Sequence, residues 1–288
     1  MPCRPLAHEA LWQQLDHGAV PNNSLAARVE RQIEMPRISA IVITKNEADN
    51  IAACLASVAF CDERIVVDCG SEDDTVRIAE AAGARVMFHA WEGFGAQKNF
   101  ALSLAQGDWV LSIDADERVT PALKAEIEAA IASGQADGYE MPRRSTFCGR
   151  QMRYSGWYPD YVLRLFRRGR ARFADRLVHE GVVCDGSVAR LAEPLVHNSI
   201  PSLEDALAKI DRYSTAGAAM LVSEGRRVWF ITGIARGWFA FLRTYVLQLG
   251  FLDGREGLLA AVYNAENTYY RYMKAWLATR PPRAPFES

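Results

Sequence analysis

Residues 109–116 of the chain read Trp-Val-Leu-Ser-Ile-Asp-Ala-Asp, an apolar run that ends in two acids. An apolar run of this length is typical of a strand that is buried on both faces of a parallel sheet. Asp114 and Asp116 follow it directly, and residues i and i+2 of an extended chain point to the same side. The two carboxylates can therefore converge on one ligand, although a solvated acidic turn has the same sequence pattern.

Three further apolar runs precede this one, and each is followed by a helical pattern. The runs lie at 41–43, 65–67 and 86–88, and the helical patterns at about 48–58, 75–82 and 96–105. Alternation of short buried strands with helices predicts βαβ units and a Rossmann-like, mostly parallel α/β sheet. Ligands of such sheets bind at the carboxyl ends of the strands, where Asp114 and Asp116 stand.

The chain divides into three regions. We expect a helical N-terminal appendage over residues 1–35, an α/β domain over 36–200 that divides near residue 140, and a C-terminal helical extension over 201–288. The other expected elements are a helix over 121–132, a strand over 138–141, a hairpin over 161–173 turned at Arg168 and Gly169, and helices over 203–222, 228–250 and 256–278.

The composition limits the class of protein. Half of the 288 residues are hydrophobic, and 33 basic against 35 acidic residues leave a net charge of −2. That total argues against a nucleic-acid binder, which needs a broad basic surface. It hides an asymmetry, because residues 1–140 carry 11 basic and 22 acidic side chains whereas 141–288 carry 22 and 13. The six cysteines lack zinc-like spacing and no signal peptide is apparent, so we expect a cytoplasmic protein.

Polar residues also follow the first two strands. Asp68 ends the second strand, where a buried carboxylate is costly unless it is paired or faces a ligand. Ser71 and Asp74 come next with the spacing of a helix N-cap, which is a structural alternative for them. Thr44 and Glu47, after the first strand, have capping-box spacing. No glycine-rich phosphate loop follows the first strand, which disfavours a dinucleotide oxidoreductase and a P-loop NTPase.

Two carboxylates at the end of a strand suit a hard divalent cation. Mg²⁺ or Mn²⁺ prefers oxygen ligands, and either ion can bridge Asp114 and Asp116 to the oxygens of a diphosphate. The sequence therefore predicts a cation site for a phosphorylated ligand.

In order and spacing, these strand ends and the segment Gly-Ala-Gln-Lys-Asn at 95–99 resemble the family 2 glycosyltransferases of the glycosyltransferase A fold, over about residues 37–200. The resemblance implies that residues 36–140 bind the nucleotide sugar and the metal, and that 141–200 bind the acceptor. Asp114 and Asp116 would hold the metal. The nucleotide-sugar residues that it implies are Thr44, Asn46, Glu47, Asp68, Lys98 and Asp114. Cys69 departs from the family pattern, which commonly has a second acid there.

Residues 161–169 and 178–180 are similar to the branch of that family that contains a lipopolysaccharide core β-1,4-glucosyltransferase. The similarity implies an inverting transfer in which Glu180 takes the proton from the acceptor hydroxyl. His179 is the rival for the role of base. A polar strand end is the structural alternative for this pair.

Residues 141–172 contain nine Arg, no Lys and a single acid. Arg favours forked recognition of phosphate and carboxylate groups. We therefore expect Arg164, Arg167 and Arg168 to bind the donor diphosphate or an anionic acceptor, unless the run is a solvated basic face. His197 is expected to be a structural histidine or part of a polar region of the site.

Residues 229–251 are rich in aromatic side chains but include Arg236 and Arg243, seven residues apart on one helical face. A membrane-spanning helix bears such charges poorly. An amphipathic helix that lies on the inner face of the cytoplasmic membrane fits better. A core-packing or dimer helix fits equally well.

These patterns together predict a metal-dependent, inverting hexosyltransferase that uses Mg²⁺ or Mn²⁺. The expected donor is UDP-glucose, and the expected acceptor is a lipid-linked saccharide such as the lipopolysaccharide inner core, at the cytoplasmic face of the membrane. The alternatives are a family 2 transferase that acts on polyprenyl phosphate or on protein, and a non-catalytic module that binds nucleotide sugars or glycans.

Overall fold

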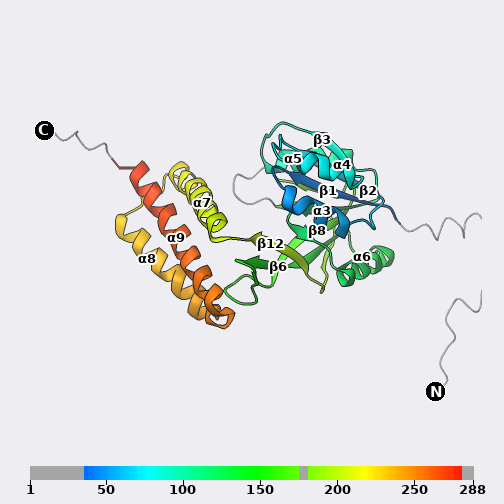
Figure 1. Cartoon of the computed structure of the whole chain (residues 1–288). Coiled ribbons are helices and arrows are strands. Elements are labelled where there is room, and N and C mark those ends of the chain that lie inside the picture. The colour runs from blue at the N-terminus through cyan, green and yellow to red at the C-terminus, as the bar shows by residue number, and fades with distance from the viewer. Residues whose placement is uncertain (1–35, 175–180, 281–288) are drawn as a thin grey trace, which may run out of the picture. The chain divides into compact units, whose positions relative to one another are not determined.

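The described residues form a ten-stranded β-sheet flanked by helices (Figure 1). The computed structural model describes residues 36–174 and 181–280, so the predicted N-terminal helix and the residues His179 and Glu180 lie outside the described residues. The strands of this sheet are β1 (Ile38–Thr44), β2 (Glu63–Asp68), β3 (Arg85–Phe88), β4 (Trp109–Asp114), β5 (Glu117–Arg118), β6 (Gly138–Phe147), β7 (Arg150–Gln151), β8 (Asp160–Arg167), β11 (Val188–Arg190) and β12 (Leu195–Ile200). They follow the order β3-β2-β1-β4-β8-β6-β12-β5, and β7 and β11 also pair with β6.

The first four strands form the predicted parallel sheet. β1 lies between β2 and β4 and is parallel to both, and β3 adds a parallel strand beyond β2. In this register Thr44 lies opposite Asp68, and Ile43 lies opposite Asp114. The predicted α/β fold is confirmed, and the carboxyl ends of β1, β2 and β4 meet at one edge of the sheet.

Helices cover both faces of the parallel sheet. They are α3 (Ala48–Ser57), α4 (Thr75–Ala81), α5 (Phe94–Leu104) and α6 (Pro121–Ser133), each within two residues of its predicted range. Ala40 and Val42 of β1 pack with α3, α4 and α6, whereas Ile41 packs with α5. The alternation arises because successive side chains of a strand point to opposite faces.

The second half of the sheet combines parallel and antiparallel strands. The hairpin predicted over 161–173 is wrong, because the two strands of that segment do not pair with each other. β8 is antiparallel to both β4 and β6. The chain does turn at Gly169, which has a φ of 81°. After the turn, however, β9 (Ala171–Phe173) pairs with β10 (Val182–Cys184) in a separate two-stranded sheet. Burial explains the difference, because Leu165 and Phe166 are fully buried and keep β8 in the middle of the large sheet.

Three α-helices follow β12. They are α7 (Leu203–Ser223), α8 (Phe230–Leu242) and α9 (Gly254–Ala278). The predicted C-terminal helical extension is therefore present. Within residues 36–174 and 181–280, no helix combines the length and the apolar character that crossing a bilayer requires.

The helix predicted over 228–250 is present, but it is shorter and less regular than predicted. α8 ends at Leu242, a π-helical turn covers Arg243–Leu247, and a 3₁₀ turn covers Gly250–Asp253. Leu249 has a left-handed φ of 55°, which breaks the helix between these two turns. The chain folds back there because Gly250 lies against the backbone of Thr244, where a Cβ atom would clash.

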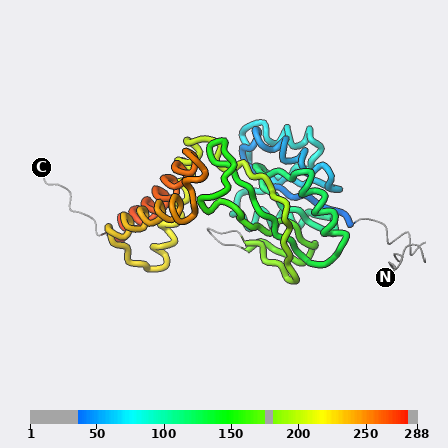
Figure 2. Tube along the Cα trace, turned by 90° about the horizontal axis from the view of Figure 1, so that it is seen from below, coloured from blue at the N-terminus to red at the C-terminus, as the bar shows by residue number. Residues whose placement is uncertain are grey.

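A buried aspartate joins the C-terminal helices to the loop between β7 and β8, which lies beside the start of α9 (Figure 2). Asp253 is 1% exposed. Its carboxylate accepts the backbone N–H of Arg153 at 3.1 Å, the N–H of Tyr154 at 2.9 Å and the hydroxyl of Ser155 at 3.1 Å. A buried carboxylate needs such partners. These bonds therefore hold the loop against the 3₁₀ turn.

Replacing Asp253 by alanine is expected to lower the free energy of unfolding by about 3 kcal/mol, because one buried and two part-buried donors lose their acceptor. Urea denaturation measures this loss. Asp211→Ala is the matched control, since that aspartate is 81% exposed and pairs only at the surface with Lys274. Its expected cost is below about 1 kcal/mol. Equal losses for the two variants would show that the Asp253 bonds do not hold the junction together.

Candidate functional site

Hydrogen bonds join the loop after β1 to the loop after β2. The Asn46 N–H donates to Ser71 Oγ at 2.8 Å, and the Glu72 N–H donates to Asn46 Oδ1 at 2.8 Å. The Glu47 N–H donates to Thr75 Oγ1 at 2.8 Å. Asn46 has a φ of 55°, a left-handed conformation that Asn adopts more readily than most residues. The two loops therefore form one rim at the carboxyl edge of the sheet.

The helix caps considered for these loops do not form. α4 begins at Thr75 with no side-chain cap, and Ser71 bonds the neighbouring loop instead. Thr44 and Glu47 make no capping box, because α3 begins after Glu47 with no side-chain cap. The buried Thr44 hydroxyl has no hydrogen-bond partner within the described part of the chain. Ser71 thus belongs to the rim and not to a helix end.

Asp68 lies at the end of β2 and is 4% exposed. Its carboxylate accepts the N–H of Gly70 at 2.8 Å, the N–H of Ser71 at 2.9 Å and the Ser71 hydroxyl. The turn after the strand therefore compensates the burial of this charge. The contact with a nucleobase that the sequence implied for Asp68 stays a prediction.

An ionic cluster surrounds Asp114. Lys98 Nζ, from α5, lies 2.9 Å from Asp114 Oδ1, and the Arg164 guanidinium, from β8, contacts Asp114 Oδ2. The same guanidinium lies 2.7 Å from Oε1 of the fully buried Glu117, whose Oε2 accepts the Asp114 N–H at 3.0 Å. Burial alone would raise the pKa of the Asp114 carboxyl, but Arg164 and Lys98 hold that pKa well below its usual range. Asp114 is therefore a firmly ionised, anchored anion.

This cluster affects two roles that the sequence predicted, those of Asp114 as a metal ligand and of Arg164 as a phosphate-binding residue. Each carboxylate oxygen of Asp114 is engaged by a cationic side chain, so the metal role predicted for Asp114 gains no support from the geometry. Arg164 is 7% exposed and is directed at two acids. Its predicted role in binding phosphate likewise stays a prediction.

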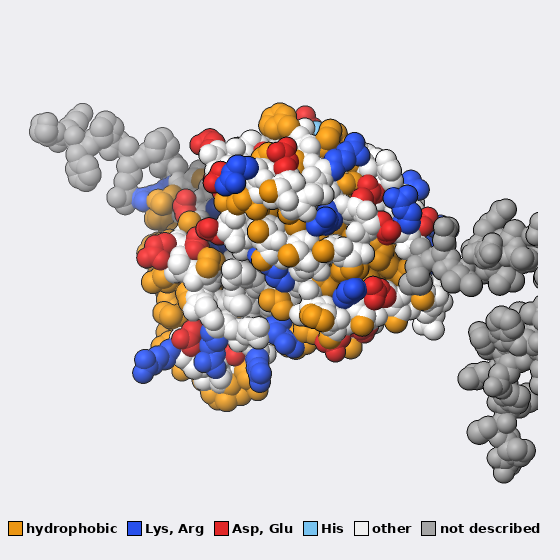
Figure 3. Space-filling model, turned by 45° about the vertical axis from the view of Figure 1, so that its right-hand side comes forward, with side chains coloured by type: hydrophobic (Ala, Val, Ile, Leu, Met, Phe, Trp, Pro, Cys, Tyr) orange, Lys and Arg blue, Asp and Glu red, His pale blue; other side chains and the backbone are white. Residues whose placement is uncertain are grey.

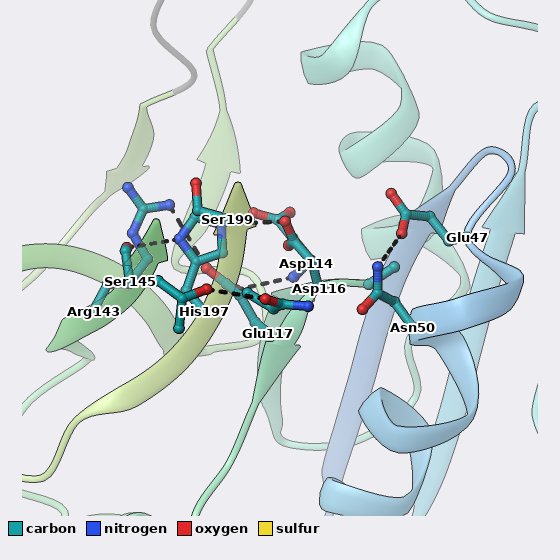
Figure 4. A network of polar contacts seen from close by, with 12 residues as sticks. Glu47, Asn50, Asp114, Asp116, Glu117, Arg143, Ser145, His197 and Ser199 are labelled. Atoms are coloured by element: carbon teal, nitrogen blue, oxygen red, sulfur yellow. Dashed lines mark hydrogen bonds and ion pairs between the residues drawn. The ribbon is translucent and has the colours of Figure 1, made fainter. Parts of the chain in front are cut away.

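Asp116 faces a histidine from β12 (Figure 4). His197 Nε2 lies 3.2 Å from Asp116 Oδ2, and His197 Nδ1 lies 2.9 Å from Ser145 Oγ of β6. The bond to Ser145 fixes the orientation of the ring. The side chains of Asp116 and His197 are 22% and 13% exposed, so both remain accessible to a small ligand.

Glu47 lies on the rim, on the side of Asp116 opposite to His197 (Figure 4). Its Oε2 accepts a hydrogen bond from Asn50 Nδ2 at 2.9 Å. Burial raises the pKa of the Glu47 carboxyl, the Asn50 bond lowers it, and the negative charge of Asp116 raises it again. A cation beside Asp116 would relieve that repulsion.

Asp116 and His197 are suited to hold a divalent cation. His197 Nε2 and Asp116 Oδ2, 3.2 Å apart, contact each other directly. Neighbouring ligands of an octahedral Mg²⁺ lie about 3 Å apart, so a cation could replace this contact with little movement of either side chain. Across residues 36–174 and 181–280, no group of three or more His, Cys, Asp or Glu side chains has the geometry of a metal site. The described residues thus offer a pair of side chains, Asp116 and His197, as ligands for such a cation.

Residues 39–188 match the family model for glycosyl transferase family 2. The chain belongs to this family. The lipopolysaccharide core biosynthesis glycosyltransferase LpsC of Rhizobium meliloti is 32% identical over 255 residues, which cover 82% of this chain and 93% of LpsC. An uncharacterised glycosyltransferase of Rickettsia felis is 34% identical over 253 residues, which cover 83% of this chain and 89% of that protein. The structure of S. aureus TarS 1–349 in complex with UDP-GlcNAc aligns with a TM-score of 0.46 and 16% identity, over 83% of this chain and 90% of that chain.

Two of the predicted arginines of this family 2 glycosyltransferase lie away from the carboxyl edge. Arg167 pairs with Trp109 at the start of β4, about 16 Å along the strand from Asp114. Its guanidinium stacks on the Trp109 ring at 4.8 Å, and Arg168 Nε donates to the Gly107 carbonyl at 2.8 Å. The structure does not bring Arg167 and Arg168 together with Arg164. The binding role predicted for them gains no support from their position.

The sequence did not predict the positions of two residues of the candidate site. Glu117 follows the acidic pair directly, but nothing in the sequence shows that it is buried against Arg164. His197 was expected as a structural histidine or part of a polar region, and the structure places its ring against Asp116. The available signal was a histidine and an asparagine inside a short strand that begins and ends with apolar residues.

Proposed function

We propose that this family 2 glycosyltransferase is inverting and metal-dependent, and that it moves glucose from UDP-glucose to a lipid-linked saccharide such as the lipopolysaccharide inner core. The pair of Asp116 and His197, 3.2 Å apart at the carboxyl edge of the sheet, is the observation that supports the metal dependence. The similarity to LpsC over 82% of this chain supports the class of acceptor. We also propose that the protein works at the cytoplasmic face of the membrane.

The rim would bind the nucleoside. Thr44, Asn46 and Glu47 lie on the β1 side of it and Asp68 on the β2 side, at adjacent strand ends. Lys98 and Arg164 compensate the charge of Asp114. Asp116, which has no Lys or Arg partner among the described residues, is therefore the acid that we expect next to the diphosphate.

Asp116 and His197 would hold Mg²⁺ or Mn²⁺, and Ser145 would keep the histidine ring in place. When bound, the cation would neutralise the negative charge that develops on the departing diphosphate. The proton of the acceptor hydroxyl needs a base, a role worth about 10²–10⁴-fold in rate. Glu180, with His179 as its rival, stays the predicted base, and both lie outside the described residues.

Purified protein is expected to release UDP from UDP-glucose only when both a divalent cation and lipopolysaccharide inner core are present. The new glycosidic bond, examined by NMR, is expected to have the opposite anomeric configuration to the donor. EDTA should abolish the reaction and Mn²⁺ should restore it. A panel of UDP-, GDP-, ADP- and dTDP-sugars identifies the donor. Binding of nucleotide sugars without any turnover would contradict the proposal and favour a binding module.

A further inference from the structure

Helix α8 packs through its smallest residues and exposes its largest ones. Gly233, Gly237 and Ala240 are the buried residues of the helix. A Cβ atom on Gly233 would clash with Met273, and one on Gly237 would lie 3.1 Å from Tyr269 Cβ, so both glycines allow close contact with α9. The large apolar side chains of α8 are therefore available on its other side.

The outward side of α8 is apolar along its length. With 3.6 residues per turn, Ile231, Ala235, Trp238 and Leu242 fall opposite the buried glycines. Ile231 is 66% exposed and Trp238 is 64% exposed. Exposed apolar surface of this extent on a soluble chain marks an interaction site.

The turns between α8 and α9 continue this surface. Leu247 is 69% exposed, and Leu249, Phe251 and Leu252 are also exposed. We call the apolar face the exposed side chains of Ile231, Trp238, Phe239, Leu242, Val246, Leu247, Leu249, Phe251 and Leu252. An open groove of about 460 Å³ between α8 and α9, lined in part by Trp238, Phe241 and Tyr269, adjoins it.

Arginine side chains lie beside the apolar face, and their positive charge indicates what kind of surface binds there. Residues 226–252 contain four Arg and no Lys, Asp or Glu. Arg236 and Arg243 lie seven residues apart on one flank of the helix, and Arg236 stacks on Tyr272 at 5.2 Å. Figure 3 shows hydrophobic side chains gathered at the lower left of this face of the molecule, with Lys and Arg and some Asp and Glu side chains beside them. Two copies of such a face would bring like charges together, whereas an anionic lipid surface would neutralise them.

We propose that the apolar face docks on a bilayer that contains anionic phospholipids. Trp238 and Leu247 enter the boundary between headgroups and acyl chains, and Arg236 and Arg243 reach the lipid phosphates. The inference rests on the proposed function only in that a membrane location suits a lipid-linked acceptor.

Co-sedimentation of the full chain with vesicles tests the docking surface. The protein is expected to bind vesicles of phosphatidylcholine and phosphatidylglycerol, and to bind pure phosphatidylcholine more weakly. The double variant Trp238→Ser/Leu247→Ser is expected to lose at least about tenfold in partitioning, because two large apolar side chains no longer enter the lipid. Val188→Ser is the matched control, since Val188 is 44% exposed on β11, outside the apolar face, and its variant should bind as the wild type does.

Replacing the flanking arginines by glutamine measures how much their positive charge contributes to lipid binding, apart from the apolar side chains. Arg236→Gln/Arg243→Gln is expected to weaken binding to anionic vesicles by about tenfold or more and to leave binding to neutral vesicles unchanged. Equal binding of the wild type and both double variants would overturn the proposal. A wild type that ignores vesicles and forms a dimer in light scattering, which Trp238→Ser dissociates, would assign the face to a second copy instead. Transfer to a deacylated, water-soluble acceptor is measured in parallel, because its absence would count against the proposed function and not against the docking surface.

Discussion

Replacing Asp116 by asparagine is expected to lower the rate of transfer about 10²–10³-fold. Asp116 lies at the carboxyl edge with its side chain 22% exposed, and among the described residues that side chain is paired with His197 and not with a Lys or Arg. An amide keeps the shape but loses the charge that would hold a cation against a diphosphate. Steady-state kinetics at saturating donor, together with the melting temperature, measures the effect and shows whether the fold is retained.

The control for this variant is Asp185→Asn. Asp185 is 65% exposed and pairs at the surface with Arg172, away from the carboxyl edge. Its variant is expected to turn over at the wild-type rate. Full metal-dependent activity in Asp116→Asn would show that Asp116 is not the residue that holds the cation.

Replacing Arg164 by methionine is expected to lower the free energy of unfolding by about 3–5 kcal/mol. The guanidinium pairs with both Asp114 and Glu117, and Glu117 is fully buried. Its removal leaves Asp114 with Lys98 alone and leaves the buried Glu117 with only the more distant Arg143, 3.7 Å away. Urea denaturation of the wild type and the variant measures the loss. The slope of the transition is compared between the two proteins, because a changed slope would indicate a different denatured state or unfolding that is no longer two-state.

Two further variants make this prediction specific. Arg167→Met lies on the same strand, but Arg167 is 39% exposed and pairs loosely with Asp137 at 3.6 Å, so its expected cost is below about 1 kcal/mol. The double variant Arg164→Met/Glu117→Gln should recover part of the lost stability, because it removes the buried charge that Arg164 compensates. Equal losses in Arg164→Met and Arg167→Met would contradict the role assigned to the ionic cluster.

The strand ends could be predicted from the sequence because their signals are local. An apolar run of five residues and the acids that follow it determine both β4 and the position of Asp114 and Asp116. The parallel register then brings Thr44, Asp68 and Asp114 to one edge without any further information. The boundaries of α3, α4, α5 and α6 were predicted to within two residues for the same reason.

The partners of these acids could not be predicted, because they come from distant parts of the chain. His197 reaches Asp116 only through the pairing of β12 with β5 and β6. The run of arginines suggested one basic surface, but β8 carries Arg164 to the buried acids and Arg167 to the opposite end of β4. The helix over 228–250 breaks at Leu249 because the chain must fold back to bury Asp253 against a loop about 100 residues earlier in the sequence.

The central claim is that Asp116 and His197 hold the cation of a metal–nucleotide complex at the carboxyl edge. Electron spin echo spectroscopy of Mn²⁺ in the presence of UDP tests it directly, because a coordinated imidazole nitrogen modulates the echo. We predict nitrogen modulation in the wild-type complex, its loss in His197→Gln, and loss of bound Mn²⁺ in Asp116→Asn. Modulation that persists in His197→Gln, or Mn²⁺–UDP binding that is unchanged in Asp116→Asn, would contradict the claim.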